Sequence, residues 1–336
     1  MKKINQIDKV FLKQVIYTLI YLRIRKIPAT NICILKYLFK NKNFYLDQKN
    51  VLISLRIILD FLINKGKVVY EFGAYYWIFE NEFYRKQQFY KNAIELKKNS
   101  FSKIKIARKI CRILKYLPFI KLIGINGTVA LGNARKKSDI DFFVICKDKR
   151  IWTTRLLMII ILEILDRRKK KGKNKDRICL NSFANFKNLE FRYQDRYSAL
   201  ELLAMLNIID RDNCYTKLVK ENLPWIKKYF AINDLEVILN KNSLLSFNLQ
   251  KPFIFRAADF LFGLKIFNFI EQAARLFQEK RIKKKAAKLK KGQVYWSDDA
   301  LIFHPKPKSR LYQKKFLKRL KKEKKQLKEL FKAFKI

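Results

Sequence analysis

Two aspartates, Asp139 and Asp141, are the residues whose type and spacing most directly indicate chemistry. They alternate with Ile140 in the segment SDIDFFVI, which predicts a β-strand with both carboxylates on one face. Two acids on one face repel each other unless cations lie between them. Mg²⁺, or the similar Mn²⁺, prefers carboxylate and phosphate oxygens, so the pair predicts a two-metal site that also holds a nucleoside triphosphate.

A glycine and a threonine lie upstream of the acids at a predicted phosphate-binding turn. Gly127 and Thr128 follow the apolar segment FIKLIGIN, where a strand is expected to turn into a helix. A residue without Cβ allows phosphate to approach the backbone amides at the start of a helix. We therefore expect phosphate donors and metal-binding acids to converge on one site.

The segment INGTVALGNARKKSDIDFFVI, residues 125–145, resembles the DNA polymerase β-like nucleotidyltransferase superfamily. The pattern of that superfamily is an apolar strand, Gly-Ser, an intervening loop, and then Asp-apolar-Asp-apolar. The match is in strict order over these residues, and the surrounding core fits more loosely. The resemblance implies transfer of a nucleoside monophosphate from a triphosphate to a hydroxyl group, with pyrophosphate as the leaving group.

The same resemblance implies roles for individual residues. Gly127 and Thr128 would hold the phosphates. Asp139 and Asp141 would hold the metals, and Ser138 would shape the start of the strand. Thr128 stands where the family usually has Ser, a change that keeps the hydroxyl group and adds a methyl group.

The family's third carboxylate is expected on a later strand, here the segment ICLNSFA at about residues 178–184. That segment offers only Asn181, whose amide oxygen can ligate a metal but supplies neither negative charge nor a base. Glu190, in the following segment NLEFRY, is the candidate substitute. Arg135 and Lys137 precede the acids and would attract the triphosphate, unless this basic loop is simply solvated.

Two further polar residues have weaker assignments. Arg155 would either attract the triphosphate or be solvated, as for the basic loop. His304 is the only histidine, so chemistry that needs several histidines is excluded, and we interpret it as a structural turn residue.

The composition indicates a folded chain with a polyanionic partner. With 336 residues, 49% of them hydrophobic, the chain is long enough for about two or three domains. Its 76 Lys and Arg against 28 Asp and Glu give a net charge of +48, which favours nucleic acid as a partner. The alternative is an AT-rich coding sequence, because such a sequence raises Lys, Asn, Ile and Phe without selection for binding.

The cysteines and the apolar runs indicate in which cellular compartment the protein is expected. The 5 cysteines are scattered and never spaced as CxxC, so neither a disulfide framework nor a zinc site is predicted, and a reducing cytoplasm is expected. The first residues do not resemble a signal peptide. The longest apolar run, residues 156–162, is far shorter than a membrane span.

The N-terminal region predicts a winged helix. Helices are expected at residues 11–25 and 30–40, and a third helix begins from a cap at Asp47 and ends at Gly66. A hairpin with Gly73 at its turn follows.

The third helix of a winged helix usually enters a nucleic-acid major groove, and Arg56, Lys65 and Lys67 would supply charge here. The alternative is a buried or protein-binding helix, because Leu55, Ile58 and their neighbours make this helix apolar on most sides.

Three regions are therefore predicted. A winged helix-like domain covers residues 1–85, and an α/β nucleotidyltransferase core, a mixed sheet with flanking helices, covers residues 86–195. A linking helix pair is expected at residues 81–117, at the start of this core. Residues 196–336 form a basic helical domain.

The last predicted helix, from residue 309, carries an apolar stripe formed by Phe316, Leu320, Leu327, Phe331 and Phe334. Such a basic amphipathic helix could lie on RNA, on DNA or on an anionic membrane surface, or it could pack back on its own domain.

The expected activity is that of a cytoplasmic, Mg²⁺-dependent enzyme that transfers a nucleoside monophosphate to a hydroxyl of RNA, protein or a small molecule. The first alternative is an inactive nucleotidyltransferase-like protein that binds nucleic acid or regulates through its winged helix. The second is a basic peripheral membrane protein. The sequence specifies neither the acceptor, nor the preferred triphosphate, nor the oligomeric state.

Overall fold

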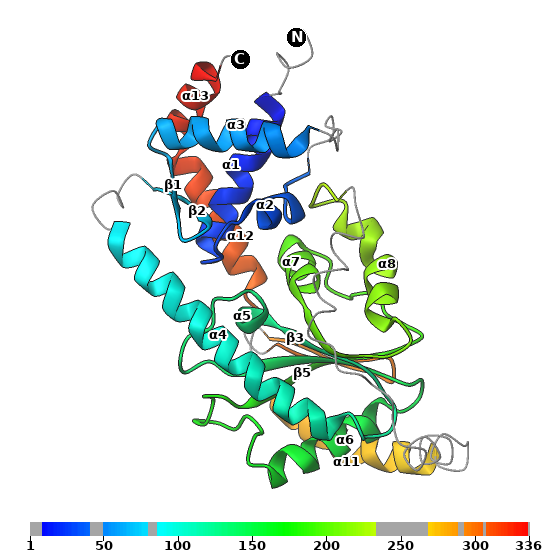
Figure 1. The fold of residues 1–336 in the computed structure, drawn as a ribbon. Helices are drawn as coiled ribbons and strands as arrows, with labels where there is room; N and C mark the ends of the chain where they lie inside the picture. Colours follow the sequence, from blue (N-terminus) through cyan, green and yellow to red (C-terminus); the bar gives the residue numbers. More distant parts are fainter. Residues whose placement is uncertain are drawn as a thin grey trace.

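The computed structural model describes residues 9–40, 50–79, 86–232, 268–287, 292–304 and 307–334. Its elements form a helical N-terminal unit and an α/β unit built on a six-stranded sheet (Figure 1).

The N-terminal unit has three helices followed by a hairpin, in the predicted order. These are α1 (Lys9–Ile24), α2 (Asn31–Lys36), α3 (Val51–Asn64), β1 (Val68–Glu71) and β2 (Ala74–Trp77). The Thr30 hydroxyl caps α2 by accepting from the Cys33 amide at 3.2 Å. The predicted cap Asp47 lies outside the described residues, and Asn50 precedes the first turn of α3. At the hairpin turn Phe72 and Gly73 both have positive φ, the conformation of a tight two-residue loop.

The sheet of the α/β unit has the order β6-β3-β4-β5-β8-β7, and its β4–β5 pair is parallel whereas the other pairs are antiparallel. Its strands are β3 (Ile120–Asn126), β4 (Ile140–Cys146), β5 (Ile178–Asn185), β6 (Leu206–Asp210), β7 (Gln293–Trp296) and β8 (Ala300–His304). This mixed sheet confirms the predicted α/β class in its general form. The region 196–336, predicted to be helical, supplies β6, β7 and β8, so that part of the prediction was wrong. Strands of four or five residues carry too little periodicity to be recognised.

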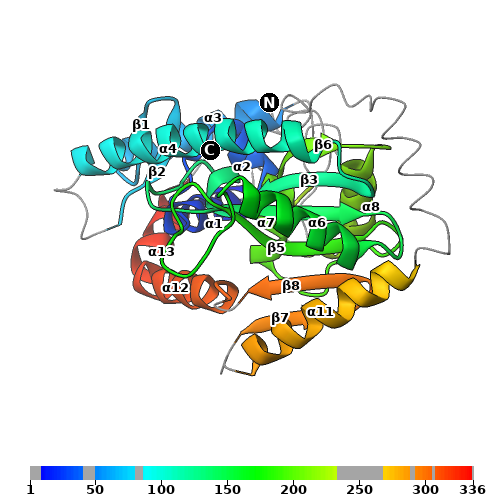
Figure 2. The ribbon, with the colours of Figure 1, turned by 90° about the horizontal axis from the view of Figure 1, so that it is seen from below.

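Helices cover both faces of the sheet (Figures 1 and 2). On one face lie α4 (Lys86–Leu114), α6 (Ile151–Ile164) and α11 (Asn268–Ala286), which share a core with Ile123 and Val144. On the other lie α7 (Arg196–Ala204) and α8 (Cys214–Ile226), with Leu122, Phe143 and Ile145. The expected helix pair at 81–117 is the single helix α4, because no Gly or Pro interrupts its sequence.

The last two helices, α12 (Ser309–Lys322) and α13 (Lys324–Ala333), pack against the N-terminal unit (Figures 1 and 2). The Phe316 ring meets the Tyr21 ring edge-on with centroids 5.5 Å apart, and the Phe334 ring meets the Phe61 ring at 4.9 Å. The apolar stripe therefore packs on the protein itself, mainly on the N-terminal unit rather than on the predicted C-terminal domain. In the described ranges no helix combines the length and apolarity that crossing a membrane requires.

Candidate functional site

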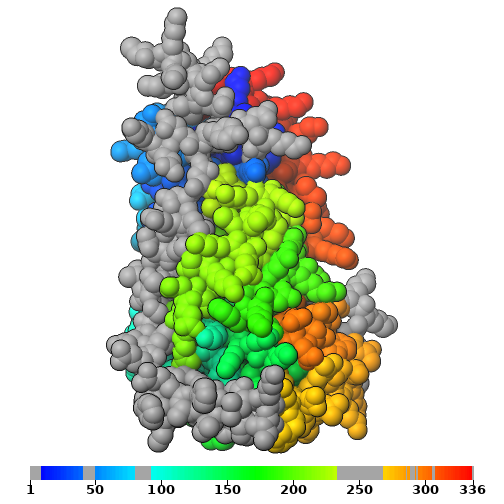
Figure 3. All heavy atoms as spheres, turned by 90° about the vertical axis from the view of Figure 1, so that its right-hand side faces the viewer, coloured from blue at the N-terminus to red at the C-terminus, as the bar shows by residue number. Residues whose placement is uncertain are grey.

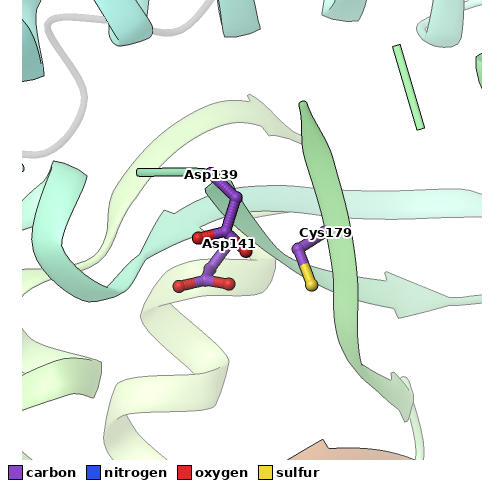
Figure 4. A group of neighbouring side chains, drawn as sticks. All are labelled: Asp139, Asp141 and Cys179. Atoms are coloured by element: carbon purple, nitrogen blue, oxygen red, sulfur yellow. The ribbon is translucent and has the colours of Figure 1, made fainter. Parts of the chain in front are cut away.

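The acid pair lies where β4 begins. Asp141 is the second residue of the strand and Asp139 immediately precedes it, so both side chains are on the sheet face that α7 covers. Cys179, on the neighbouring strand β5, pairs in register with Asp141. Figure 4 shows both carboxylates close together with the Cys179 sulfur beside them, and the ligand atoms of the three lie within 4.8 Å of one another. The predicted convergence of two carboxylates is therefore present.

Gly127 faces the acid pair from the next strand. It follows Asn126, the β3 residue that pairs with Asp141, and it begins the short helix α5 (Gly127–Ala130). Its φ is +70°, a conformation that residues with side chains rarely adopt, and a Cβ there would lie 2.7 Å from Asp141 Oδ2. Glycine is thus required both by the turn and by the close approach of a carboxylate.

Glu201, on α7, is a buried carboxylate of this site that the sequence analysis did not identify. Its Oε2 accepts a hydrogen bond from the Gly127 amide at 2.7 Å, and its Oε1 accepts from Arg25 Nη2 at 2.5 Å. The structure therefore differs from the expectation that the Gly127 amide is available to phosphate. The partners of Glu201 lie 74 and 176 residues away in sequence, so no local motif could have found it.

Arg25 joins four segments of the chain at this point. It lies just beyond α1 and is 4% exposed. Its guanidinium lies 4.2 Å from the Tyr197 ring centroid on α7 and 4.6 Å from the Tyr312 centroid on α12. Because Glu201 also holds Gly127, the N-terminal unit, α7, α12 and the turn after β3 are connected through one ion pair.

Asn181 and Lys169 contact the acid pair directly. Asn181 Nδ2 donates to Asp141 Oδ1, while Asn181 Oδ1 accepts from the Cys179 thiol at 2.8 Å. The pairing of β4 with β5 is irregular between Phe142 and Phe143, opposite Asn181, as in bulges that redirect a side chain. Lys169 Nζ forms an ion pair with Asp139 Oδ2. The Asn181 amide and the Lys169 ammonium therefore each contact one of the two carboxylates.

The negative charge of Asp139 and Asp141 is only partly compensated by the residues around them. Burial, and then the neighbouring Asp139 carboxylate, raise the pKa of Asp141 well above that of an ordinary aspartate, although Lys169 opposes this. For Lys169, burial lowers the pKa, but the hydrogen bond to Asp139 and the surrounding acids outweigh it and the pKa is raised. Burial and Asp141 raise the pKa of Cys179 to about 12, so its thiol stays protonated.

These donors fit a hard divalent cation. Mg²⁺ and Mn²⁺ take carboxylate oxygens, whereas a protonated thiol is a poor ligand for either. Asn126 Oδ1 is also buried nearby, with no hydrogen-bond partner among the residues described, and it would suit a metal-bound water. Asp139 and Asp141 are therefore the residues that would hold the ion.

A cavity of about 680 Å³ opens beside the acids, a size that suits a small ligand. Its walls include five predicted site residues, Gly127, Asp139, Asp141, Asn181 and Glu190. They also include basic and aromatic residues that were not predicted, among them Lys169, Arg192, Tyr295 and Lys308. Phosphate charge and an apolar ring system could both be accommodated there.

The remaining predicted residues lie elsewhere or have other partners. Thr128, Ser138, Arg135 and Lys137 are not among the residues that line the cavity. Ser138 instead closes the turn before β4, where its hydroxyl accepts from the Arg135 amide at 3.1 Å.

Glu190 lines the cavity, but its carboxylate accepts a hydrogen bond from Gln194 Nε2 at 2.7 Å. Among the described residues, Cys179 is the only His, Cys, Asp or Glu whose ligand atom lies close enough to share a metal ion with the acid pair, so Glu190 does not supply the third carboxylate. Arg155, on α6, bonds to Gln278 of α11 on the opposite side of the sheet, so it does not reach the acids. His304 ends β8 and lines the cavity, where burial lowers its pKa, and its interpretation as a turn residue was wrong.

Comparisons of the chain with protein-family models, with curated proteins and with solved structures find no match.

Proposed function

We propose that this protein is a metal-dependent nucleotidyltransferase of the DNA polymerase β-like type, which transfers a nucleoside monophosphate from a triphosphate to a hydroxyl acceptor. The observation that supports this most is the pair Asp139 and Asp141, which lies on one face of β4 at the wall of a ligand-sized cavity. The glycine that the resemblance requires lies directly opposite, with no room for a Cβ.

Different residues of the cavity would bind the metal and the phosphates. Asp139 and Asp141 would hold Mg²⁺ or Mn²⁺, which when bound neutralises phosphate charge and favours a deprotonated hydroxyl. Lys169 and Lys308 line the same cavity and would offset the charge of the triphosphate. On ligand binding Lys169 would exchange its contact with Asp139 for one with phosphate, since the metal would then neutralise that carboxylate.

Glu201 has a positioning role in this proposal. It holds the Gly127 amide and so fixes the turn that faces Asp141. Phosphate would be bound mainly by the metal and the lysines, because that amide is already engaged.

We also propose that the N-terminal unit is a winged helix. Its three helices precede a hairpin, and Tyr75 of β2 donates its amide to the Ala29 carbonyl at 2.9 Å, which adds a bridge between the hairpin and the α1–α2 connection. On α3, Leu52 and Ile53 are 60% and 61% exposed and Arg56 pairs with Asp60. This supports the protein-binding alternative for α3 over insertion into a major groove.

The transferase proposal is tested with purified protein, each α-labelled triphosphate, Mg²⁺ and total RNA. Label transfer is expected from the unchanged protein and is expected to vanish in Asp139→Ala and Asp141→Ala. Asp148→Ala is the matched control, because Asp148 follows the other end of β4, bonds to Asn185 and does not line the cavity. Absence of both transfer and metal-dependent triphosphate binding in the unchanged protein would refute the proposal.

A second candidate is an inactive, nucleic-acid-binding protein of the same fold. It is favoured by Asn181, which stands on the strand where the third carboxylate is expected, and by Lys169, whose ammonium already neutralises Asp139. This protein would bind RNA with a steep dependence on salt and would bind no triphosphate in the presence of metal.

A further inference from the structure

The C-terminal helices carry a lysine ridge, which we define as the lysines of α12 and α13 together with the preceding Lys308. Every lysine of the ridge is exposed. The acids of this segment are Glu323, which is buried, and Glu329. Among the described residues no carboxylate forms an ion pair with any lysine of the ridge, so its positive charge faces solvent uncompensated.

Packing holds the ridge in one orientation. Phe316, Leu327, Leu330 and Phe334 are each 4% exposed and fix the opposite side of the helices on the N-terminal unit. Figure 3 shows the two helices, in orange and red, along one edge of the molecule with side chains that project outward. Aligned like charges repel one another, and a polyanion that lies along them would relieve that repulsion.

The ridge begins at the cavity. Lys308 and Ser309 line the same cavity as Asp139 and Asp141, and α12 leads away from this point. At a rise of about 1.5 Å per residue, α12 alone is roughly 20 Å long. Phosphates along one strand are spaced by only a few ångströms, so this length spans several of them.

The buried apolar side decides between a membrane and a nucleic acid. A basic amphipathic helix binds a membrane by inserting its apolar face. In α12 and α13 most of that face is occupied by the protein's own core. Leu311 and Leu317 of α12 are 50% and 56% exposed, but they are two side chains among many exposed lysines, so the available surface is mainly cationic. Lysine charge alone suits the phosphate backbone of a polynucleotide.

We propose that the lysine ridge binds the backbone of a single-stranded polynucleotide whose end enters the cavity. Binding along the ridge is inferred from its exposed lysines and from the buried apolar side of α12 and α13. That the strand end is the acceptor rests on the proposed transferase function. A single strand is favoured because a cavity of about 680 Å³ admits one terminal nucleotide and excludes a duplex.

The test compares two full-length variants with equal loss of charge. The ridge variant is Lys314→Gln, Lys315→Gln, Lys318→Gln and Lys322→Gln. The control variant is Lys97→Gln, Lys98→Gln, Lys105→Gln and Lys109→Gln on α4. These lysines are also exposed, and α4 covers the sheet face opposite to the cavity. Thermal melting should show that both variants remain folded, since all eight side chains are exposed.

Fluorescence anisotropy with a labelled single-stranded RNA, the same sequence as single-stranded DNA, and a duplex is measured over a range of salt. The ridge variant is expected to bind single strands at least about tenfold more weakly than the unchanged protein, with a shallower salt dependence, and the α4 variant less than about threefold. Comparison of the single-stranded RNA with the single-stranded DNA shows which of the two polynucleotides the ridge prefers.

Equal losses in the two variants would show that binding is a diffuse effect of net charge and would overturn the proposal. Tighter binding to the duplex than to either single strand would overturn it as well. So would ridge-dependent binding to anionic phospholipid vesicles with no ridge-dependent binding to oligonucleotides.

Binding of triphosphate with Mg²⁺, measured on the same samples, separates this proposal from the transferase proposal. The ridge variant should retain it, whereas Asp139→Ala and Asp141→Ala should lose it and still bind single strands. If the unchanged protein binds no triphosphate but the ridge variant still loses single-strand binding, the ridge stands and the transferase proposal fails.

Discussion

The acid pair and Glu201 line one cavity but differ in how their charge is compensated. Glu201 has the Arg25 guanidinium on one oxygen and the Gly127 amide on the other. Asp139 and Asp141 share one face of β4, and their cationic contact is Lys169, on Asp139. Burial and Asp139 accordingly raise the pKa of Asp141.

This difference separates a carboxylate that holds the structure from carboxylates available to a ligand. A buried carboxylate with a full set of partners contributes to folding, because its removal leaves those partners buried without a hydrogen bond or counter-charge. A half-buried carboxylate that repels its neighbour costs stability in the free protein, and that cost is recovered when a cation binds. Variants on the two sides of the cavity should therefore have opposite effects on stability and activity.

The largest effect is expected from Asp141→Asn. Loss of a metal-binding carboxylate should reduce label transfer by about a thousandfold or more, because the metal is expected to contribute several kcal/mol to the transition state. Without metal, the variant should be as stable as the unchanged protein or more so, since a repulsive charge is removed. Activity assays and chemical denaturation in EDTA measure the two quantities. A large loss of stability would mean that Asp141 is a structural residue like Glu201.

Glu201→Gln should have the opposite profile. The change keeps the shape of the side chain but leaves the Arg25 guanidinium buried without its counter-charge, which should lower the free energy of unfolding by about 3 kcal/mol. Glu190→Gln is the matched control, because Glu190 is an exposed acid of the same cavity whose partner is Gln194. Denaturant titration measures the free energy of unfolding of both variants, and equal values would show that Glu201 has no larger structural role than Glu190.

The same comparison explains which parts of the site the sequence could predict. Asp141 is the second residue of β4 and Asp139 lies two positions before it, so their spacing alone places them together. The contacts of Glu201 depend on how α7 packs against α1 and the turn after β3, and a local pattern carries no information about such packing. Residue 201 follows Leu200 and precedes Leu202 in a helix buried on most sides, which gives no sign of a functional acid.

The fold was predictable where the apolar pattern is long. The helices α1 and α3, the hairpin and the strands β3 to β5 lie close to their predicted positions. The strands β6, β7 and β8 are short and come late in the chain, and the pairing of β6 with β3 and of β8 with β5 is a long-range contact. The position of His304 in the cavity follows from that pairing and could not be read from its neighbours.

Gly127→Ala should have an intermediate effect. Alanine at a φ of +70° is strained, and its Cβ would also lie 2.7 Å from Asp141 Oδ2. Gly132→Ala is the matched control, since Gly132 has the same φ of +70° but no atom within 4 Å of an added Cβ. Backbone strain should cost about 1 kcal/mol in both variants, and only Gly127→Ala should also weaken Mg²⁺ binding. Thermal melting and metal titration measure these effects, and equal Mg²⁺ affinity in the two variants would contradict the role of Gly127 beside the acid.

Asn181→Asp should give the smallest change, and it tests the acid pair by increasing its charge. The amide of Asn181 donates to Asp141 Oδ1, so a carboxylate there would replace an attractive contact by repulsion. Without metal the variant should lose about 1 kcal/mol of stability, because two half-buried acids would become three. With metal, a third anionic ligand should raise the Mg²⁺ affinity by roughly tenfold. Isothermal titration with Mg²⁺ and denaturation in EDTA test both halves, and Asn174→Asp is the control, because Asn174 is exposed and does not line the cavity. If Asn181→Asp were neutral in both measurements, the amide would not face the metal position, and the two aspartates alone would define the site.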